Sequence, residues 1–262
     1  MLGLLAAAPL SIAQAADMAV KAPPPVAPPV FDWGGVYVGA SASWFQSNTT
    51  WQYANPVPAT LTPFSDRETL AAWGIHGGAQ WQFGQIVLGI EADYTNPSST
   101  FQGATSNGTA TSVCTANIGQ VCQTRMSSIS TVGGRGGWAF GDWLVFGEGG
   151  WAAGTIETQL FNSTSGTLFD TTRNSDYRNG WYAGGGINYA LYKSALMDVI
   201  IGGDYRHIDL RSHFQPSSAD AFGPSPPGPN GRNIGGTADQ VRFTLDVKTN
   251  GWNFLGPVVA KY

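Results

Sequence analysis

The sequence predicts an all-β fold, an eight-stranded antiparallel up-and-down β-barrel that crosses a membrane. Eight short segments alternate apolar and polar residues with a period of two, and the connections between them alternate between very short and long. Only 11% of the 262 residues are charged, against about 25% in an ordinary soluble domain. A soluble sheet buries its apolar face, whereas a strand of an outer-membrane barrel turns that face to lipid and its polar face inward. We therefore expect the apolar faces to meet lipid.

The predicted strands follow one another from residue 36 to residue 248, and each is close to the ~9 to 11 residues that a tilted strand needs to cross a bilayer. The clearest alternation sets Val241, Phe243, Leu245 and Val247 against Arg242, Thr244, Asp246 and Lys248. The eight segments are 36–44, 71–83, 86–94, 127–140, 143–151, 181–189, 198–206 and 241–248. Gly84-Gln85 and Gly141-Asp142 are typical hairpin turns, and a short turn is expected around Tyr192 and Lys193.

The loop lengths and the aromatic residues give the barrel an orientation. Outer-membrane barrels have short periplasmic turns and long extracellular loops, so the short connections predict the periplasmic end. Aromatic residues gather at both ends of the strands, as expected for rings in the two headgroup layers. The periplasmic set is Trp81, Phe83, Trp138, Phe140, Trp143, Tyr189 and Tyr192, and the other set is Trp44, Tyr94, Trp151 and Trp181.

The first 32 residues are predicted to precede the barrel. An apolar run ends in Ala13-Gln14-Ala15, which is typical of a signal-peptide cleavage site, and the run is too short for a membrane anchor. We predict a signal peptide over 1–15, a Pro-rich periplasmic lead-in over 16–32 and the barrel over 33–262. The lead-in is either a plain extended segment or a recognition ligand for a periplasmic partner. No later stretch is apolar for 18 residues, so no transmembrane helix is expected.

Charged residues of both signs are predicted to face the barrel interior. An eight-stranded barrel is only wide enough to be filled by side chains, and isolated buried charges are costly. These residues are therefore expected to form an ion-pair network, with a gated narrow pore or proton path as the alternative. Glu91 and Asp93 have the spacing of an acid/base pair, but a structural role is expected. The predicted network is His76, Glu91, Asp93, Arg135, Glu148, Asp198, Asp204, Arg206, Arg242, Asp246 and Lys248.

Few other residues point to chemistry. Cys114 and Cys122 lie in one predicted loop of an exported chain, which favours a disulfide. No metal site is predicted, since a metal would need four ligands and no histidine lies near them. His207 and His213 do not assemble a catalytic triad with any serine that the sequence can identify. We expect no catalytic residues, no cofactor and, with a net charge of −4 and no basic stripe, no nucleic-acid partner.

The chain resembles the small OmpA-like, porin-family outer-membrane proteins of Gram-negative bacteria. The resemblance rests on the segments 31–39, 81–93, 135–145, 180–190 and 256–262. It implies an eight-stranded surface protein of the cell outer membrane with a role in envelope integrity or interaction, rather than an enzyme. A narrow pore and a loop-borne haem or adhesion receptor are the alternatives. The expected partners are outer-membrane lipid and lipopolysaccharide, the barrel-assembly machinery and an unidentified surface ligand.

Overall fold

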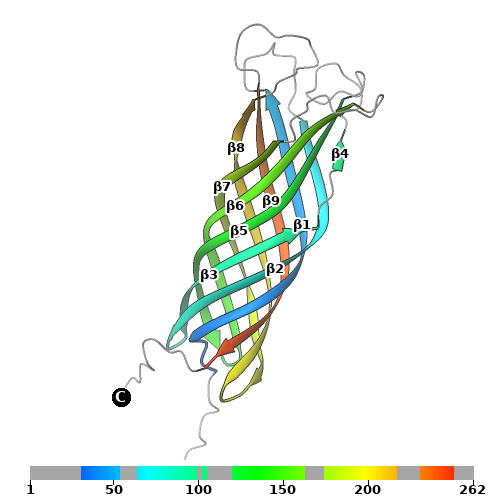
Figure 1. Cartoon of the computed structure of the whole chain (residues 1–262). Coiled ribbons are helices and arrows are strands. Elements are labelled where there is room, and N and C mark those ends of the chain that lie inside the picture. Colours follow the sequence, from blue (N-terminus) through cyan, green and yellow to red (C-terminus); the bar gives the residue numbers. More distant parts are fainter. Residues whose placement is uncertain are drawn as a thin grey trace, which may run out of the picture.

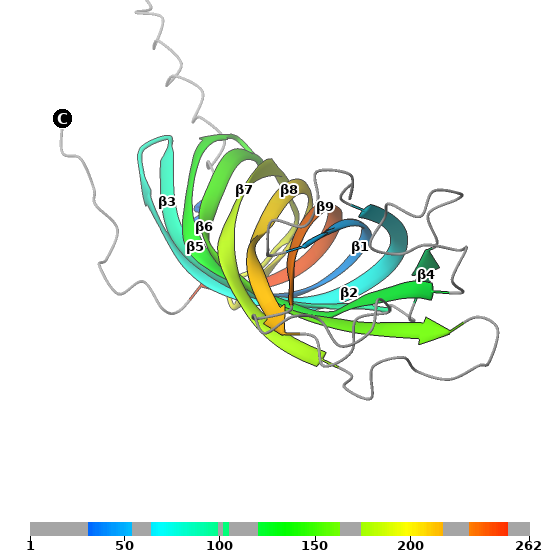
Figure 2. The same cartoon turned by 90° about the horizontal axis from the view of Figure 1, so that it is seen from above.

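The computed structural model describes residues 31–53, 64–98, 102–104, 120–162, 174–216 and 231–250. These residues form an all-β structure in which the strands wrap around a common axis (Figures 1 and 2). Within this part of the chain, no helix is long and apolar enough to cross a membrane. The strands are β1 (Gly35–Tyr53), β2 (Phe64–Phe83), β3 (Ile86–Pro97), β4 (Gln102–Ala104), β5 (Gln120–Phe140), β6 (Trp143–Asn162), β7 (Asn174–Lys193), β8 (Met197–Pro216) and β9 (Gly231–Thr249).

The sheet closes on itself, which confirms the predicted barrel. Each long strand pairs antiparallel with its neighbours in the chain, β9 pairs with β1, and β3 pairs with β5. The three-residue β4 also pairs with β5 and continues the part of the wall begun by β3. The described residues therefore form a ring of eight antiparallel strands, one of them in two pieces. Closure leaves no free edge around the membrane-spanning part, as a barrel in lipid requires.

Three tight connections join neighbouring strands at one end of the barrel. Gly84 and Gly141 take positive φ angles of 64° and 62°, the conformation of the first central residue in a type II′ hairpin turn. Both two-residue turns are as predicted. The third differs from the prediction: Tyr192 and Lys193 still belong to β7, and the turn follows at 194–196. A register shift between Ala190 and Tyr192 accompanies this longer hairpin.

The predicted outward residues form an apolar belt around the lower half of the barrel. On β1 the belt runs from Val36 to Trp44, and equivalent stretches occur on the other strands. With a rise of roughly 3.3 Å per residue and a tilt of about 40°, such a stretch is roughly 20 Å tall. This height is close to the ~25 Å apolar band of outer-membrane barrels. The exposed members of the belt include Val38, Trp44, Trp73, Ile75, Ile90, Val132, Trp138, Phe243 and Leu245.

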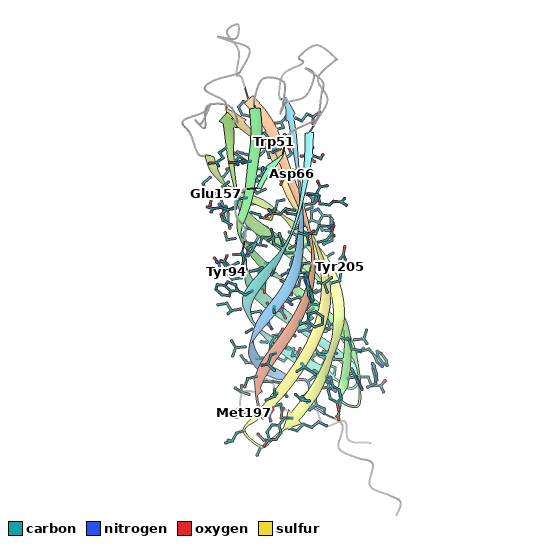
Figure 3. The ribbon with its side chains drawn as sticks, turned by 90° about the vertical axis from the view of Figure 1, so that its right-hand side faces the viewer. Trp51, Asp66, Tyr94, Glu157, Met197 and Tyr205 are labelled. Atoms are coloured by element: carbon teal, nitrogen blue, oxygen red, sulfur yellow. The ribbon has the colours of Figure 1, made fainter. Side chains whose placement is uncertain are left out.

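The strands continue well beyond this belt, which the sequence did not predict. Most are 19 to 21 residues long rather than about ten. The outward face becomes polar just past the upper aromatic residues: Trp44 is followed by Gln46, Tyr94 by Asn96 and Tyr205 by His207. Figure 3 shows Tyr94 and Tyr205 at similar heights, with Trp51, Asp66 and Glu157 above them and Met197 at the lower end. Much of what was expected to be loop is therefore barrel wall above the membrane.

Above the belt the polarity of the two faces of the wall changes. Many of the inward side chains become apolar, beside buried polar residues such as Ser47, Thr49 and Arg178. The apolar ones form a buried core of Phe45, Ala72, Met126, Ile129, Ala152, Ile156, Tyr182, Ile208, Leu210 and Ala238. A strand surrounded by water must bury its apolar face, whereas a strand surrounded by lipid must expose it. This change therefore marks the outer boundary of the membrane, beyond which the upper barrel follows the rules of a soluble protein.

Candidate functional site in the barrel interior

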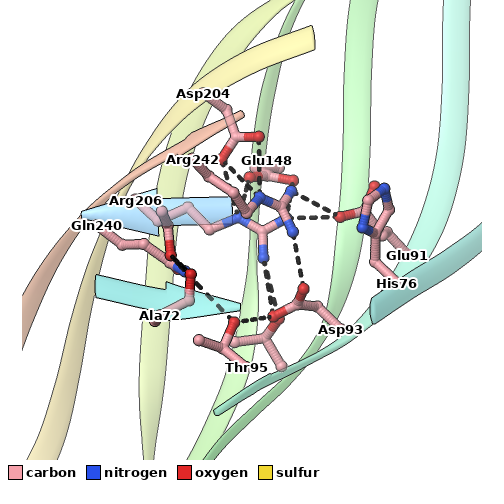
Figure 4. Close-up of polar contacts among 12 residues, drawn as sticks. Ala72, His76, Glu91, Asp93, Thr95, Glu148, Asp204, Arg206, Gln240 and Arg242 are labelled. Atoms are coloured by element: carbon pink, nitrogen blue, oxygen red, sulfur yellow. Dashed lines mark hydrogen bonds and ion pairs between the residues drawn. The ribbon is translucent and has the colours of Figure 1, made fainter. Parts of the chain in front are cut away.

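The predicted charged residues all lie inside the lower half of the barrel. Each has a side chain no more than 5% exposed. Seven of them form a central cluster, shown in part in Figure 4. Its members, from β3, β5, β6, β8 and β9, are Glu91, Asp93, Arg135, Glu148, Asp204, Arg206 and Arg242. Residues that are far apart in the chain thus meet across the barrel.

Glu91 is the hub of this cluster. Its Oε1 accepts hydrogen bonds from Arg206 Nη2 at 2.6 Å and from Arg242 Nη2 at 3.1 Å. Its Oε2 accepts from Tyr37 Oη at 2.7 Å and from Arg135 Nη1 at 3.2 Å. One carboxylate therefore holds three guanidinium groups. Each of the four hydrogen bonds is charge-assisted, because the acceptor is a carboxylate.

Arg206 and Arg242 connect Glu91 to the other carboxylates. Arg206 donates from Nε and Nη2 to the two oxygens of Glu148, at 2.6 and 3.1 Å. Arg242 donates from Nε to Asp204, at 3.1 and 3.0 Å, and from Nη1 to Asp93 at 2.8 Å. The planar guanidinium suits such two-pronged contacts. Four carboxylates face three guanidinium groups, so the cluster of described residues is close to neutral.

Aromatic rings complete the surroundings of the cluster. The Arg135 guanidinium lies over the Phe146 ring, 3.6 Å from its centre, and the Arg206 guanidinium lies 5.3 Å from the centre of the Tyr182 ring. When the oxygen and nitrogen of the Asn188 side-chain amide exchange positions, the oxygen accepts a hydrogen bond from Arg135 Nη2 at 2.9 Å. Cation–π contacts and this hydrogen bond offset part of the cost of burying the charges.

A separate pair joins β2 to β9 beside the cluster. His76 Nε2 lies 2.6 Å from Asp246 Oδ1. The inward-facing residue between them is Gly39 of β1, where a Cβ atom would collide with both His76 Nε2 and Asp246 Oδ1. Glycine at this position leaves room for the pair.

The two remaining predicted residues, Lys248 and Asp198, pair with each other and help to hold the segment 31–34 as a plug at the periplasmic end. Lys248 Nζ lies 3.2 Å from Asp198 Oδ2 and donates to the carbonyl oxygens of Asp32 and Gly34. The segment 31–34 thereby turns into the barrel, and Trp33 is completely buried. The Trp33 backbone is held on both sides, accepting from Gln80 Nε2 at 2.5 Å and donating to Gln82 Oε1 at 2.6 Å.

The plug is continuous with a small apolar cluster that fills the periplasmic end. It consists of Phe31, Trp33, Val87, Ala139, Leu144, Phe146, Ala190 and Ile200. The barrel boundary expected at residue 33 falls inside this plug, since Phe31 also packs there, with its ring 4.8 Å from that of Trp33. Along the axis, the described interior thus holds an apolar plug, then the charged cluster, then the upper apolar core.

Several residues of the site were missing from the sequence prediction. The alternation of β1 indicated that Tyr37 faces inward, but nothing in the sequence paired it with Glu91 and Arg135. Thr95 and Gln240 hydrogen-bond across the barrel at 3.3 Å, and Gln240 also contacts Ser43. The sequence did not indicate that Trp33 turns into the barrel as a plug, because this residue precedes the first alternating segment.

The predicted disulfide and the remaining histidines are not part of the central cluster. Cys114 lies outside the described residues, and so does the side chain of Cys122, so the disulfide stays a prediction. His207 and His213 are on the upper part of β8 and lie 2.8 Å from Asp239 and Asp176 respectively. Within the described ranges, no group of three His, Cys, Asp or Glu residues is arranged to hold a metal ion.

This geometry is suited to bracing the barrel. The carboxylates of the central cluster are held by arginines. The cluster and the bonds around it tie β1, β3, β5, β6, β8 and β9 together through the interior. A closed antiparallel barrel with an apolar outer belt and a charged, filled interior is an outer-membrane β-barrel protein.

Comparison with known proteins specifies the family. The chain belongs to the family described as the outer membrane protein beta-barrel domain, whose model matches residues 3–253. The protein is thus a barrel of the cell outer membrane. No curated protein sequence matches the chain.

Solved structures similar to this chain are also outer-membrane barrels. Ail, the attachment invasion locus protein of Yersinia pestis, is 8% identical with a TM-score of 0.37, over 81% of this chain and 99% of Ail. Neisserial surface protein A is 10% identical with a TM-score of 0.34, over 82% and 97%. The outer membrane protease OmpT from Escherichia coli is 9% identical with a TM-score of 0.44, over 82% and 96%.

Proposed function

We propose that the protein is a structural and interaction protein of the outer membrane, not a channel or an enzyme. In this proposal the lower barrel is a braced anchor, and the upper barrel raises the chain's extracellular connections above the lipid surface. The observation that carries the proposal is the filled interior. Side chains occupy the barrel at three successive levels, and Trp33, Phe45 and Arg206 are each completely buried at their own level.

The upper barrel supports the interaction part of the proposal. On β1 the wall runs from Trp44, at the membrane boundary, to Tyr53, which adds roughly another 20 Å of height. A barrel that served only as an anchor would not need this extension. Its apolar core makes it rigid, so whatever the connections bind would be held at a fixed distance from the membrane.

The alternatives have less support. A narrow pore needs a path for water, and the buried side chains of the plug, the charged cluster and the upper core count against such a path in the described interior. A loop-borne haem or adhesion receptor depends on segments outside the described residues, so no observation favours it. For an enzyme, the interior carboxylates offer little support, because they are held by arginines.

Deletion and complementation in the native bacterium would test this proposal. We expect a deletion strain to become more sensitive to detergents and to large antibiotics, and the wild-type gene to restore resistance. Uptake of a small labelled sugar should be the same in all strains. The proposal would be contradicted, and the pore favoured, if deletion lowered sugar uptake, the wild-type gene restored it, and envelope resistance did not change.

A further inference from the structure

Four side chains form a compact polar and aromatic group on the outward face of β7, β8 and β9. Tyr205 Oη donates a hydrogen bond to Asp239 Oδ1 at 2.6 Å, and His207 Nδ1 lies 2.8 Å from the same oxygen. The Trp181 ring lies against the His207 ring, with 5.7 Å between their centres. All four are exposed or partly exposed on the outer surface. The interior network and the proposed anchoring function do not involve this group.

The depth of the group limits what it can meet. Trp181 and Tyr205 are the last aromatic residues of the apolar belt on their strands, and His207 and Asp239 are the next outward residues toward the extracellular end. Tyr205 lies at the height where the outer face becomes polar (Figure 3). Amphipathic aromatic rings at this height sit in the headgroup layer of the membrane. The available ligand is therefore the headgroup of an outer-leaflet lipid.

The hydrogen bonds hold the group in one orientation and leave two polar atoms open. Both contacts to Asp239 go to Oδ1, so Tyr205 and His207 fix the carboxylate from two sides. Asp239 Oδ2 and His207 Nε2 have no hydrogen-bond partner within the described part of the chain. A fixed carboxylate oxygen is a strong acceptor for hydroxyl groups, and Arg67 contributes positive charge near this carboxylate. Trp181 adds a flat apolar face beside it.

A sugar ring has the complementary chemistry, since it combines apolar C–H faces with a rim of hydroxyl groups. A phospholipid headgroup offers fewer hydroxyl donors and no sugar face. The headgroup of a lipopolysaccharide also carries phosphate groups, so the hydroxyl groups and the sugar face distinguish the two lipids, rather than charge. We propose that Trp181, Tyr205, His207 and Asp239 form a binding site for the sugar headgroup of an outer-leaflet glycolipid. Asp239 accepts from a sugar hydroxyl, Trp181 packs on the sugar face, and Tyr205 positions the carboxylate.

Lipid binding to the purified, folded protein tests this site. The probes are a lipopolysaccharide without its O-chain and, separately, phosphatidylglycerol, each titrated into the detergent-solubilised protein and counted by native mass spectrometry. Wild-type protein should retain the lipopolysaccharide in preference to phosphatidylglycerol. Asp239→Asn should weaken lipopolysaccharide binding roughly tenfold, the size expected when one charge-assisted hydrogen bond is lost. Tyr205→Phe should weaken it by a smaller factor.

Tyr94→Phe is the matched control, because Tyr94 lies at the same height on β3 and also loses only a hydroxyl. It should bind lipopolysaccharide as the wild type does, and all variants should keep the gel shift of a folded barrel. The site is refuted if Asp239→Asn binds with wild-type affinity, if Tyr94→Phe is weakened as much as Tyr205→Phe, or if phosphatidylglycerol is preferred. Because these substitutions are conservative and lie on the surface, loss of folding should not obscure the result.

Discussion

At the scale of single residues, Glu91 is the carboxylate that connects the arginines of the central cluster. Three arginines and one tyrosine donate to its two oxygens, and its side chain is only 3% exposed. Removing one partner from a buried ion-pair network leaves uncompensated charge, which costs far more than losing an exposed pair. The stability of the barrel should therefore depend on this residue more than on any surface charge.

We predict that Glu91→Gln lowers the free energy of unfolding by about 3–5 kcal/mol. Asp142→Asn is the control, since Asp142 pairs with Lys193 at the surface and both are more than a third exposed; it should cost at most about 1 kcal/mol. Urea unfolding in detergent micelles, followed by the gel shift between folded and unfolded forms, gives both values. Equal losses for the two variants would mean that the network does not brace the barrel.

The sequence could predict which of these residues face inward but not how they pair. The period of two decides the face of each strand, and it placed Glu91, Arg206 and Arg242 together in the interior. Pairing depends on the stagger of strands that are distant in the chain, such as β3 and β9, which no local pattern specifies. Tyr37 illustrates the limit: its inward direction was evident, whereas its bond to Glu91 was not.

At the scale of the strands, each long strand crosses two environments. β9 shows the change clearly, with Leu245 exposed to lipid at 54% and Ala238 buried in the upper core at 1%. On β9 the alternation continues without a break, so only the chemical character of its two faces reports the boundary. The sequence prediction considered only the segments with apolar outward residues, and it therefore ended the strands too early.

Arginine substitutions along β9 should reveal the lipid boundary. Leu245→Arg, within the belt, should cost roughly 2–4 kcal/mol, whereas Thr237→Arg, on the same face above it, should cost roughly 0–1 kcal/mol. Unfolding of the protein in lipid vesicles measures the difference. If both substitutions cost the same, the change of face character does not mark the edge of the membrane.

A pair of isoleucines tests the upper core. Ile156, at 1% exposure, belongs to that core, while Ile187 is 42% exposed on the lipid face. Ile156→Ala should lower the free energy of unfolding by about 2–5 kcal/mol, because it leaves a cavity, and Ile187→Ala should cost clearly less. Denaturant unfolding of both variants in micelles is the measurement. A greater loss at Ile187 would contradict the packing of the upper barrel.

At the scale of the whole molecule, the protein is a closed barrel whose described interior holds buried side chains at three levels, in the plug, the charged cluster and the upper core. The fold class and the two Gly-containing turns followed from the sequence, because a period of two and such turns are local features. The plug of Phe31 and Trp33 did not, since it depends on where the barrel mouth lies in space. The plug, the cluster and the upper core together lead to the central claim that the protein anchors and displays rather than conducts.

Conductance in a planar lipid bilayer tests that claim most directly. Pure, folded wild-type protein should give no steady single-channel steps, because three layers of side chains separate the two ends. Trp33→Ala should also stay silent, since the charged cluster and the upper core still fill the lumen. Large, stable, ion-selective steps from the wild-type protein would contradict the account and show that the barrel is a pore.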